Sequence, residues 1–177
     1  MKTRAPAVSA LVALGVVLSG TILAAPHAAA ALGTITCALG TNVVQFDPGL
    51  TYAVQDTRIT GQGLYTGCVA TDPHITSGRS TIVGRGKLNC LTSDGSTVEK
   101  ITWNTGEKST VEYSFGVIVQ PAGEAVAVVT GTVTEGKFAG SLVASPGALT
   151  TLNPLACSTP TGVQEIGGPV LLSLISL

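Results

Sequence analysis

The stretch STVEYSFGVIVQPAGEAVAVVTGTVTEGKFAGSLVA, residues 109–144, decides the fold class. In its first third, apolar side chains occupy every second position: Val111, Tyr113, Phe115, Val117 and Val119. Polar residues such as Glu112 and Ser114 fill the positions between them. Alternation with a period of two is typical of a β-strand that buries one face. The stretch therefore predicts an antiparallel sheet.

Two returning strands are expected after this first one. Residues 120–123 contain proline and glycine and predict a turn, and residues 124–134 predict the second strand. Glu135 and Gly136 are expected to form a two-residue hairpin turn in which the glycine adopts a positive φ. Residues 137–144 then form the third strand, with Phe138 on its buried face. Three antiparallel strands in succession make a meander.

The rest of the chain repeats this pattern, without apolar residues at helical spacing. Further strands are predicted at residues 33–39, 42–47, 53–60, 64–69, 79–91, 97–103 and 170–175. Residues 146–160 are expected to be irregular. About eight to ten strands separated by turns indicate one all-β domain, either an antiparallel barrel or a sandwich. Pairing of the last strand with the first would close the sheet.

Two glycines, Gly84 and Gly86, alternate inside the predicted strand at residues 79–91. They leave one face of that strand without side chains. This pattern predicts a sharp bend, a bulge or a close approach between backbones. The alternative interpretation is that the glycines make room for a ligand.

The first thirty residues have the pattern of an export signal. Lys2 and Arg4 precede an apolar run at residues 5–25, and alanines at positions 28–30 provide a small-residue cleavage site. We therefore expect a signal peptide at residues 1–30 and a secreted, extracellular domain at residues 31–177. Loss of Lys2 and Arg4 leaves seven basic residues against ten acidic ones. This balance argues against nucleic acid as a partner, and no membrane association is expected after cleavage.

Four cysteines lie in the predicted secreted domain: Cys37, Cys68, Cys90 and Cys157. An even number of cysteines outside the cytoplasm predicts disulfide bonds. We favour Cys37 with Cys68 and Cys90 with Cys157, since the second bond would fix the irregular stretch to a strand. The main alternative pairs Cys68 with Cys90 and Cys37 with Cys157. The spacing lacks a Cys-x-x-Cys motif, so neither a metal nor another cofactor is expected.

Residues suited to catalysis are few in this sequence. His27 belongs to the predicted signal, which leaves His74, next to Pro73 in a predicted turn, as the remaining histidine. The chain contains no Gly-x-Ser-x-Gly, His-Glu-x-x-His or phosphate-binding glycine motif. Its acidic residues are dispersed, so a glycosidase-like pair would require the fold to bring Asp47, Asp56 or Glu112 together. We therefore expect a protein without enzymatic activity.

Aromatic side chains are the candidate binding residues. Trp103 ends a predicted strand, and Tyr52 and Tyr65 lie near turns or strand ends, so the three are candidates for a binding rim. Packing in the core is the favoured interpretation for Trp103. The first functional hypothesis is a structural or protein-interaction module, adaptor-like, whose partner is another secreted or cell-surface protein. The alternative is a barrel that binds a small ligand or a glycan, and a secreted hydrolase built on His74 is the third.

A series of short segments follows the strand that contains Cys37: FDPGLT (46–51), DPHITSG (72–78), GKLNC (86–90), ITWNTG (101–106), GTVTEGKFAG (131–140) and ACS (156–158). This series resembles a group of small secreted four-cysteine β-proteins from actinobacteria. The resemblance spans nearly the whole predicted secreted domain. Its motifs are turns, glycines and cysteines, so it implies a fold and carries no catalytic or ligand-binding residue over to this chain.

A second similarity is to the small adaptor subunit of secreted umbrella-shaped toxin particles, which joins larger subunits through protein contacts. That similarity would imply an adaptor role. None of the segments quoted above is specific to the adaptor. The short segment between the predicted cleavage site and Cys37 also leaves little free arm to insert into a partner.

Overall fold

A computed structural model describes residues 33–91, 93–119, 125–149 and 155–176. These residues form eight β-strands and one short 3-10 helix. The elements are β1 (Ile35–Leu50), β2 (Gln55–Ala70), β3 (Gly78–Leu88), β4 (Ser93–Trp103), β5 (Lys108–Val119), β6 (Ala125–Gly136), β7 (Leu142–Leu149), η2 (Ala156–Ser158) and β8 (Val163–Ile175). Among the described residues, no helix is long and apolar enough to cross a membrane.

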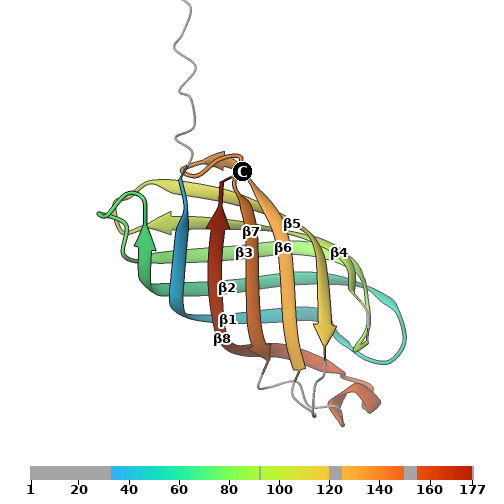
Figure 1. The fold of residues 1–177 in the computed structure, drawn as a ribbon. Helices are drawn as coiled ribbons and strands as arrows, with labels where there is room; N and C mark the ends of the chain where they lie inside the picture. Colours follow the sequence, from blue (N-terminus) through green and yellow to red (C-terminus); the bar gives the residue numbers. More distant parts are fainter. Residues whose placement is uncertain (1–32, 92, 120–124, 150–154, 177) are drawn as a thin grey trace, which may run out of the picture.

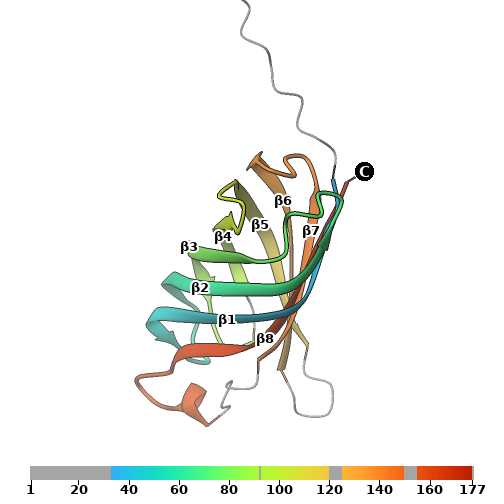
Figure 2. The same ribbon diagram turned by 90° about the vertical axis from the view of Figure 1, so that its left-hand side faces the viewer.

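The eight strands form a closed antiparallel barrel (Figure 1). Each strand pairs with the next one in sequence, and β8 pairs with β1, for example at Leu174 opposite Ile35. In both ribbon views the labelled parts of β1–β3 run across the picture, while β6 and β7 run along its height (Figures 1 and 2). The predicted all-β fold and its meander order are confirmed, and the barrel is the correct alternative. Closure between β1 and β8 is confirmed as well.

Two of the predicted strand breaks are wrong. Residues 33–39 and 42–47 belong to one strand, β1, in which the pairing with β8 shifts register between Cys37 and Gly40. The predicted strands 53–60 and 64–69 also merge into one, β2, and Gly61 and Gly63 remain paired with β1 and β3. Hydrogen bonding on both sides keeps these glycines in the sheet, although glycine by itself weakens a strand.

The predicted hairpin at Glu135 and Gly136 is wrong in position. Gly136 does adopt a positive φ of 81°, but it still belongs to β6, and the chain turns at residues 137–141. Phe138 therefore lies in a turn, with a φ of 64° that bulky residues rarely adopt. Its ring meets the Trp103 ring edge-on, with 5.7 Å between centroids. Burial of the ring in the core compensates the unfavourable backbone conformation.

The irregular stretch predicted at residues 146–160 is shorter than expected. Strand β7 continues to Leu149 and includes Pro146, which stands opposite Val128 of β6. The stretch also contains η2, which presents Cys157 to the core. The predicted turn at residues 120–123 lies outside the described residues.

The disulfides join Cys37 to Cys68 and Cys90 to Cys157, the pairing that the sequence analysis favours. Cys37 and Cys68 are direct cross-strand neighbours in β1 and β2. The second bond links Cys90, in the segment after β3, to Cys157 of η2, 67 residues further along the chain. Gly84 and Gly86 mark a close approach of β3 to β4, since a Cβ on Gly86 would lie 2.3 Å from the Gly95 Cα. This is one of the predicted explanations for the two glycines.

The barrel has two ends. The terminal end carries both described chain ends and the connections at residues 71–77, 104–107 and 137–141. The distal end carries the connection at residues 51–54, the segment after β3 and η2. We call the adjoining parts of the barrel the terminal half and the distal half.

The terminal half is filled by a continuous hydrophobic core. Its buried residues are Ile35, Cys37, Tyr65, Cys68, Ile75, Ile101, Trp103, Val111, Tyr113, Val133, Phe138, Val143, Leu172 and Leu174. They come from seven of the eight strands and from two of the connections. This dense packing gives the barrel a solid terminal half.

The distal half is less tightly closed. Its own core consists of Leu50, Ile59, Leu88, Cys90, Cys157, Val163 and Ile166. Val44 and Phe46 pack against this cluster and remain partly exposed. Among the described residues, the pairing of β4 with β5 ends at Thr97 opposite Tyr113. Beyond this pair, residues 93–96 of β4 pair only with β3, and residues 115–119 of β5 pair only with β6. The wall of the barrel therefore loosens toward the distal end.

Candidate functional site

A carboxylate lies inside the barrel, between its two halves. Glu99 belongs to β4, where Glu99, Ile101 and Trp103 alternate with outward-facing residues and point inward. Only 1% of Glu99 is exposed. Burial of a charged side chain costs free energy unless hydrogen bonds or an opposite charge compensate the loss of water. Such a residue in a small barrel therefore requires a physical explanation.

Two tyrosines provide part of the compensation. Tyr65 of β2 donates its hydroxyl hydrogen to Glu99 Oε1, and Tyr113 of β5 donates to Glu99 Oε2, both at 2.6 Å. Short bonds of this kind to a carboxylate are stronger than bonds between neutral groups. Glu99 thereby connects strands from both sides of β4.

Burial, followed by the negative charge of Glu99, raises the pKa of Tyr65 well above its ordinary value. The nearby side chains of Asn42 and Ser80 lower the same pKa to a smaller extent. Burial and then the Glu99 charge also raise the pKa of Tyr113. Both phenols therefore keep their protons at neutral pH and act as permanent donors to the carboxylate.

Two further polar atoms point to the same region without a hydrogen bond of their own. Among the described residues, neither Asn42 Oδ1 nor Ser80 Oγ has a hydrogen-bond partner at standard distance and angle, although both side chains approach the Tyr65 hydroxyl closely enough to lower its pKa, and Ser80 is only 6% exposed. The two atoms converge on Gly63: a Cβ built there would lie 2.5 Å from each and 3.4 Å from Glu99 Oε1. We call Glu99, Tyr65, Tyr113, Asn42 and Ser80 the Glu99 cluster.

The Glu99 cluster has no buried cation beside it within the described ranges. Every described arginine and lysine is exposed except Lys137, which is partly exposed at the terminal end. Lys137 is paired there with Asp72 at 2.9 Å and with Glu107 at 3.2 Å. The negative charge of Glu99 is thus stabilised by dipoles and lacks a counter-ion in the described interior.

An apolar wall extends from the Glu99 cluster toward the distal end. Val44 and Phe46 follow Asn42 on the inner face of β1, and Ile82 follows Ser80 on that of β3. Val44, Phe46 and Thr97 are partly exposed, as are Ala70, Val129 and Val170 at the margin of the core of the terminal half. The inner wall of the distal half therefore combines apolar side chains with the polar Glu99 cluster at its inner end.

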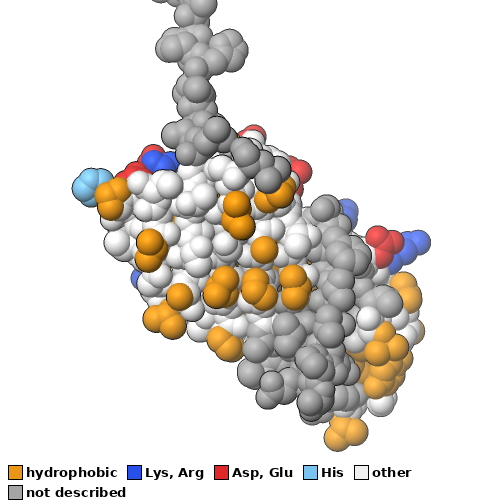
Figure 3. All heavy atoms as spheres, viewed as in Figure 1, with side chains coloured by type: hydrophobic (Ala, Val, Ile, Leu, Met, Phe, Trp, Pro, Cys, Tyr) orange, Lys and Arg blue, Asp and Glu red, His pale blue; other side chains and the backbone are white. Residues whose placement is uncertain are grey.

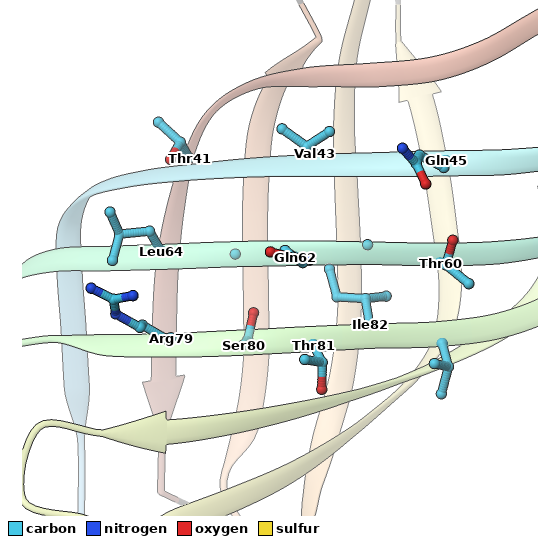
Figure 4. Close-up of a pocket in the computed structure, with 13 residues that line it drawn as sticks. Thr41, Val43, Gln45, Thr60, Gln62, Leu64, Arg79, Ser80, Thr81 and Ile82 are labelled. Atoms are coloured by element: carbon cyan, nitrogen blue, oxygen red, sulfur yellow. The ribbon is translucent and has the colours of Figure 1, made fainter.

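A second candidate region is a shallow hollow on the outer face of β1, β2 and β3 (Figure 4). Its volume is about 680 Å³. Three aliphatic side chains line it and remain accessible: Val43 (44% exposed), Leu64 (43%) and Val83 (53%). Gln45, Gln62 and Arg79 add polar groups to the same hollow. No aromatic side chain is among the described residues that line this hollow.

Charged side chains gather toward the ends of the barrel on the face seen in Figure 3, with hydrophobic and uncharged side chains between them. A charged hollow of about 560 Å³ lies on the outer face and is lined by Asp47, Asp56, Arg58, Arg85, Lys87 and Asp94. In the strand register, Arg58 stands between Asp47 and Arg85, and Lys87 between Asp56 and Asp94. Three acidic and three basic residues therefore balance one another in this hollow.

The structure does not bring the three predicted aromatic residues together. Trp103 is buried, and its Nε1 donates to Ser109 Oγ at 2.8 Å, so it belongs to the core of the terminal half. Tyr65 points into the barrel toward Glu99. Tyr52 is 50% exposed in the connection at the distal end. The predicted common rim of these residues is therefore absent, and Tyr65 contributes from the interior.

The residues considered for catalysis also lie apart. His74 is exposed in the connection at residues 71–77, where its backbone N–H donates to Asp72 Oδ1. Asp47 and Asp56 line the charged outer hollow, whereas Glu112 is exposed on β5. Across the part of the chain that the structure describes, no group of three or more His, Cys, Asp or Glu side chains is placed to hold a metal ion.

The sequence analysis missed Glu99, Asn42, Ser80 and Tyr113 as candidate site residues. The alternation in β4 contains a usable signal, since Glu99 shares a face with Ile101 and Trp103. A carboxylate on the apolar face of a strand indicates a buried polar group. Asn42 and Ser80 carry no comparable signal because uncharged polar residues are frequent throughout this chain.

No family model, curated protein or solved structure matches the chain. The resemblance to secreted actinobacterial β-proteins therefore remains a prediction from the sequence motifs. The function has to be argued from the geometry of the Glu99 cluster and of the outer hollow.

Proposed function

We propose that this protein is a secreted, non-enzymatic barrel that binds a small ligand against the inner wall of its distal half. The Glu99 cluster is the polar part of the binding site, and Val44, Phe46 and Ile82 form its apolar part. The observation that carries the proposal is the unpartnered pair Asn42 Oδ1 and Ser80 Oγ beside the buried carboxylate. Of the functions predicted from the sequence, this is the alternative hypothesis.

The free-energy cost of unpaired polar groups supports this proposal. A buried polar atom without a hydrogen bond costs about 1–3 kcal/mol. Two such atoms, Asn42 Oδ1 and Ser80 Oγ, lie beside Glu99 at the point where the apolar wall begins. A ligand that bonds to both atoms recovers this free energy on binding. Small-ligand sites typically combine an apolar lining with a few convergent polar groups.

Secretion is part of the proposal and has partial support. The two disulfides are consistent with an oxidising, extracellular environment. A non-enzymatic role is supported by the position of His74, which is exposed in a connection at the terminal end, whereas the Glu99 cluster lies inside the barrel.

Methyl NMR of the disulfide-bonded secreted domain tests the proposed function. The valine and isoleucine methyl groups form a matched set, since Val44 and Ile59 belong to the distal core and Val43 and Val83 face the outer hollow. A screen of small molecules of differing charge should yield compounds that shift Val44 and Ile59. The outward methyl groups should shift much less.

The proposed function fails if no compound of any charge shifts the inner methyl groups. It also fails if every compound that binds shifts only Val43 and Val83. Either result would favour the outer hollow over the interior as the functional surface.

The protein-interaction module remains the second candidate function. It is supported by the accessible aliphatic side chains Val43, Leu64 and Val83 in one hollow. Because the barrel is closed, the outer face of the sheet would provide the contact. A partner recovered from culture supernatant with tagged protein should lose binding to Val83→Asp and retain it with Val69→Asp, an exposed valine outside the hollow.

A further inference from the structure

We infer that the ligand of this barrel is a small amine, with a cationic ammonium head at the Glu99 cluster and an apolar body against the distal inner wall. This inference rests on the proposed function and specifies the chemistry of the ligand.

The acceptors at the site outnumber the donors. A carboxylate offers about four acceptor positions. Tyr65 and Tyr113 occupy one on each oxygen of Glu99. Asn42 Oδ1 is a further acceptor, and Ser80 Oγ can accept as well as donate. A ligand rich in N–H donors therefore complements the cluster.

Charge points to the same class of ligand. Glu99 is buried, and none of the described arginines and lysines lies inside the barrel with it. A bound cation would supply the missing opposite charge in a region where water screens little. A carboxylate or phosphate ligand would instead face repulsion from Glu99.

An ammonium group fits this set of oxygens better than a metal ion does. Calcium requires six to eight oxygen ligands at short distance. The Glu99 cluster offers one carboxylate, and its two oxygens already accept hydrogen bonds from phenols. An ammonium group has three N–H donors and needs only three dispersed acceptors. Glu99, Asn42 and Ser80 provide three such acceptors around Gly63.

The side chains next to the Glu99 cluster on β1 and β3 are apolar, so the rest of the ligand should be apolar as well. Val44 and Phe46 continue along β1 from Asn42, and Ile82 continues along β3 from Ser80. Val44 and Phe46 are partly exposed at this wall, so contact with an alkyl or aryl group would bury further apolar surface. An amine with a short hydrocarbon chain has the required combination.

Isothermal titration calorimetry with hexylamine, hexanol and hexanoate tests the inference. The three probes share a hydrocarbon chain and differ in the charge of the head group. Hexylamine should bind about 10- to 100-fold more tightly than hexanol, since bonds to charged groups are worth more than neutral ones. Hexanoate should bind more weakly than hexanol.

Two variants with matched controls locate the effect. Glu99→Gln keeps the shape of the side chain and should weaken hexylamine binding by about tenfold or more. Glu112→Gln removes the same charge from the outer face of the neighbouring strand and should leave binding unchanged. Ser80→Ala removes a buried hydroxyl that has no hydrogen-bond partner, so it should weaken binding while the thermal midpoint stays the same or rises. It serves as the test if Glu99→Gln fails to fold.

The outcomes separate the inference from the proposed function. If hexanol or hexanoate binds as tightly as hexylamine and shifts the inner methyl groups, the interior site stands and the amine assignment is overturned. The amine assignment is also overturned if Glu99→Gln, folded as the wild type is, binds hexylamine with unchanged affinity. If none of the probes and none of the screened compounds reaches the interior, the proposed function fails together with the inference.

Discussion

The two halves of the barrel use the same strands in different ways. In the terminal half, inward side chains from seven strands meet in one large hydrophobic core, with Ala70, Val129 and Val170 partly buried at its margin. In the distal half, Val44, Phe46 and Thr97 stay partly exposed on the same inner face, and the β4–β5 pairing ends. The Glu99 cluster lies where one half changes into the other. One half thus provides stability, while the other leaves polar and apolar surface for contact.

This difference explains how a buried carboxylate is tolerated. A solid core on one side of Glu99 holds Tyr65 and Tyr113 in place as donors. Prearranged dipoles lower the cost of burying the charge. On the other side, Asn42 and Ser80 keep hydrogen-bonding capacity free of protein partners. The Glu99 cluster is therefore held in place by the core and still contains two polar atoms without hydrogen bonds.

The largest effect is expected from truncation of matched phenylalanines in the two halves. Phe138→Ala removes a fully buried ring that packs edge-on against Trp103 and should cost about 3–5 kcal/mol of unfolding free energy. Phe46→Ala removes a partly exposed ring from the distal wall and should cost about 1–2 kcal/mol. Urea unfolding of both variants measures the difference. Equal costs would contradict the contrast between the halves.

A second prediction concerns Glu99 as the link between the halves. Glu99→Ala leaves the Tyr65 and Tyr113 hydroxyls without their acceptor and opens a cavity, so it should destabilise the fold by about 3 kcal/mol. Glu112→Ala, on the exposed face of β5, should change stability by less than about 0.5 kcal/mol. Chemical denaturation compares the two. A Glu99→Ala variant as stable as Glu112→Ala would mean that the hydrogen bonds contribute nothing net.

The third prediction is a loss of stability at alkaline pH. The pKa values of Tyr65 and Tyr113 are raised in the folded protein, mainly by burial and then by the Glu99 charge. The two protonated phenols contribute fully to the free energy of unfolding below the ordinary tyrosine pKa of 10.0. This contribution is lost as the pH rises above that value, since the tyrosines of the unfolded chain ionise first.

The ultraviolet absorbance of ionised tyrosine measures this effect during an alkaline titration. Ionisation of Tyr65 and Tyr113 should coincide with unfolding, and Tyr65→Phe should reduce the pH dependence. Reversible ionisation of both phenols near the ordinary pKa of 10.0 in the folded protein would contradict the description of the cluster.

The smallest effect is expected at the terminal end. The hydrogen bond from Lys137 holds the Asp72 pKa below its ordinary value of 3.8. Stability from this pair is present above that value and is lost as the pH falls through the lowered pKa of the folded state. The pair is partly exposed, so its contribution is small. NMR titration of the Asp72 carboxyl group should show its pKa rising in Lys137→Gln; an unchanged pKa would rule out Lys137 as the cause.

Much of the fold follows from local patterns in the sequence. The period-two alternation at Val111 and Tyr113 predicts the burial seen in the structure, and the favoured cysteine pairing matches the bonds observed. Phe138 could not be placed correctly because a bulky residue with positive φ occurs only when tertiary packing compensates it. Gly61 and Gly63 look like turn residues locally, yet strands on both sides keep them in β2.

The candidate site was less accessible to prediction. Asn42, Ser80 and Glu99 come from three different strands, and only barrel closure and register bring them around Gly63. Trp103 and Tyr65 are candidates in the sequence because aromatic side chains are frequent at binding sites. Ile101, the alternation partner of Trp103, already places Trp103 on an inward face, whereas the neighbours of Tyr65 at the same spacing are glycines. The alternation along each strand is therefore the more informative signal.

Paramagnetic relaxation of methyl groups by a small dissolved nitroxide tests the contrast between the halves most directly. Val133 represents the terminal interior, Val44 the distal interior and Val43 the outer face. We expect Val44 to relax faster than Val133 and more slowly than Val43. Protection of Val44 equal to that of Val133 would show a barrel packed solid throughout and would contradict an accessible site next to Glu99.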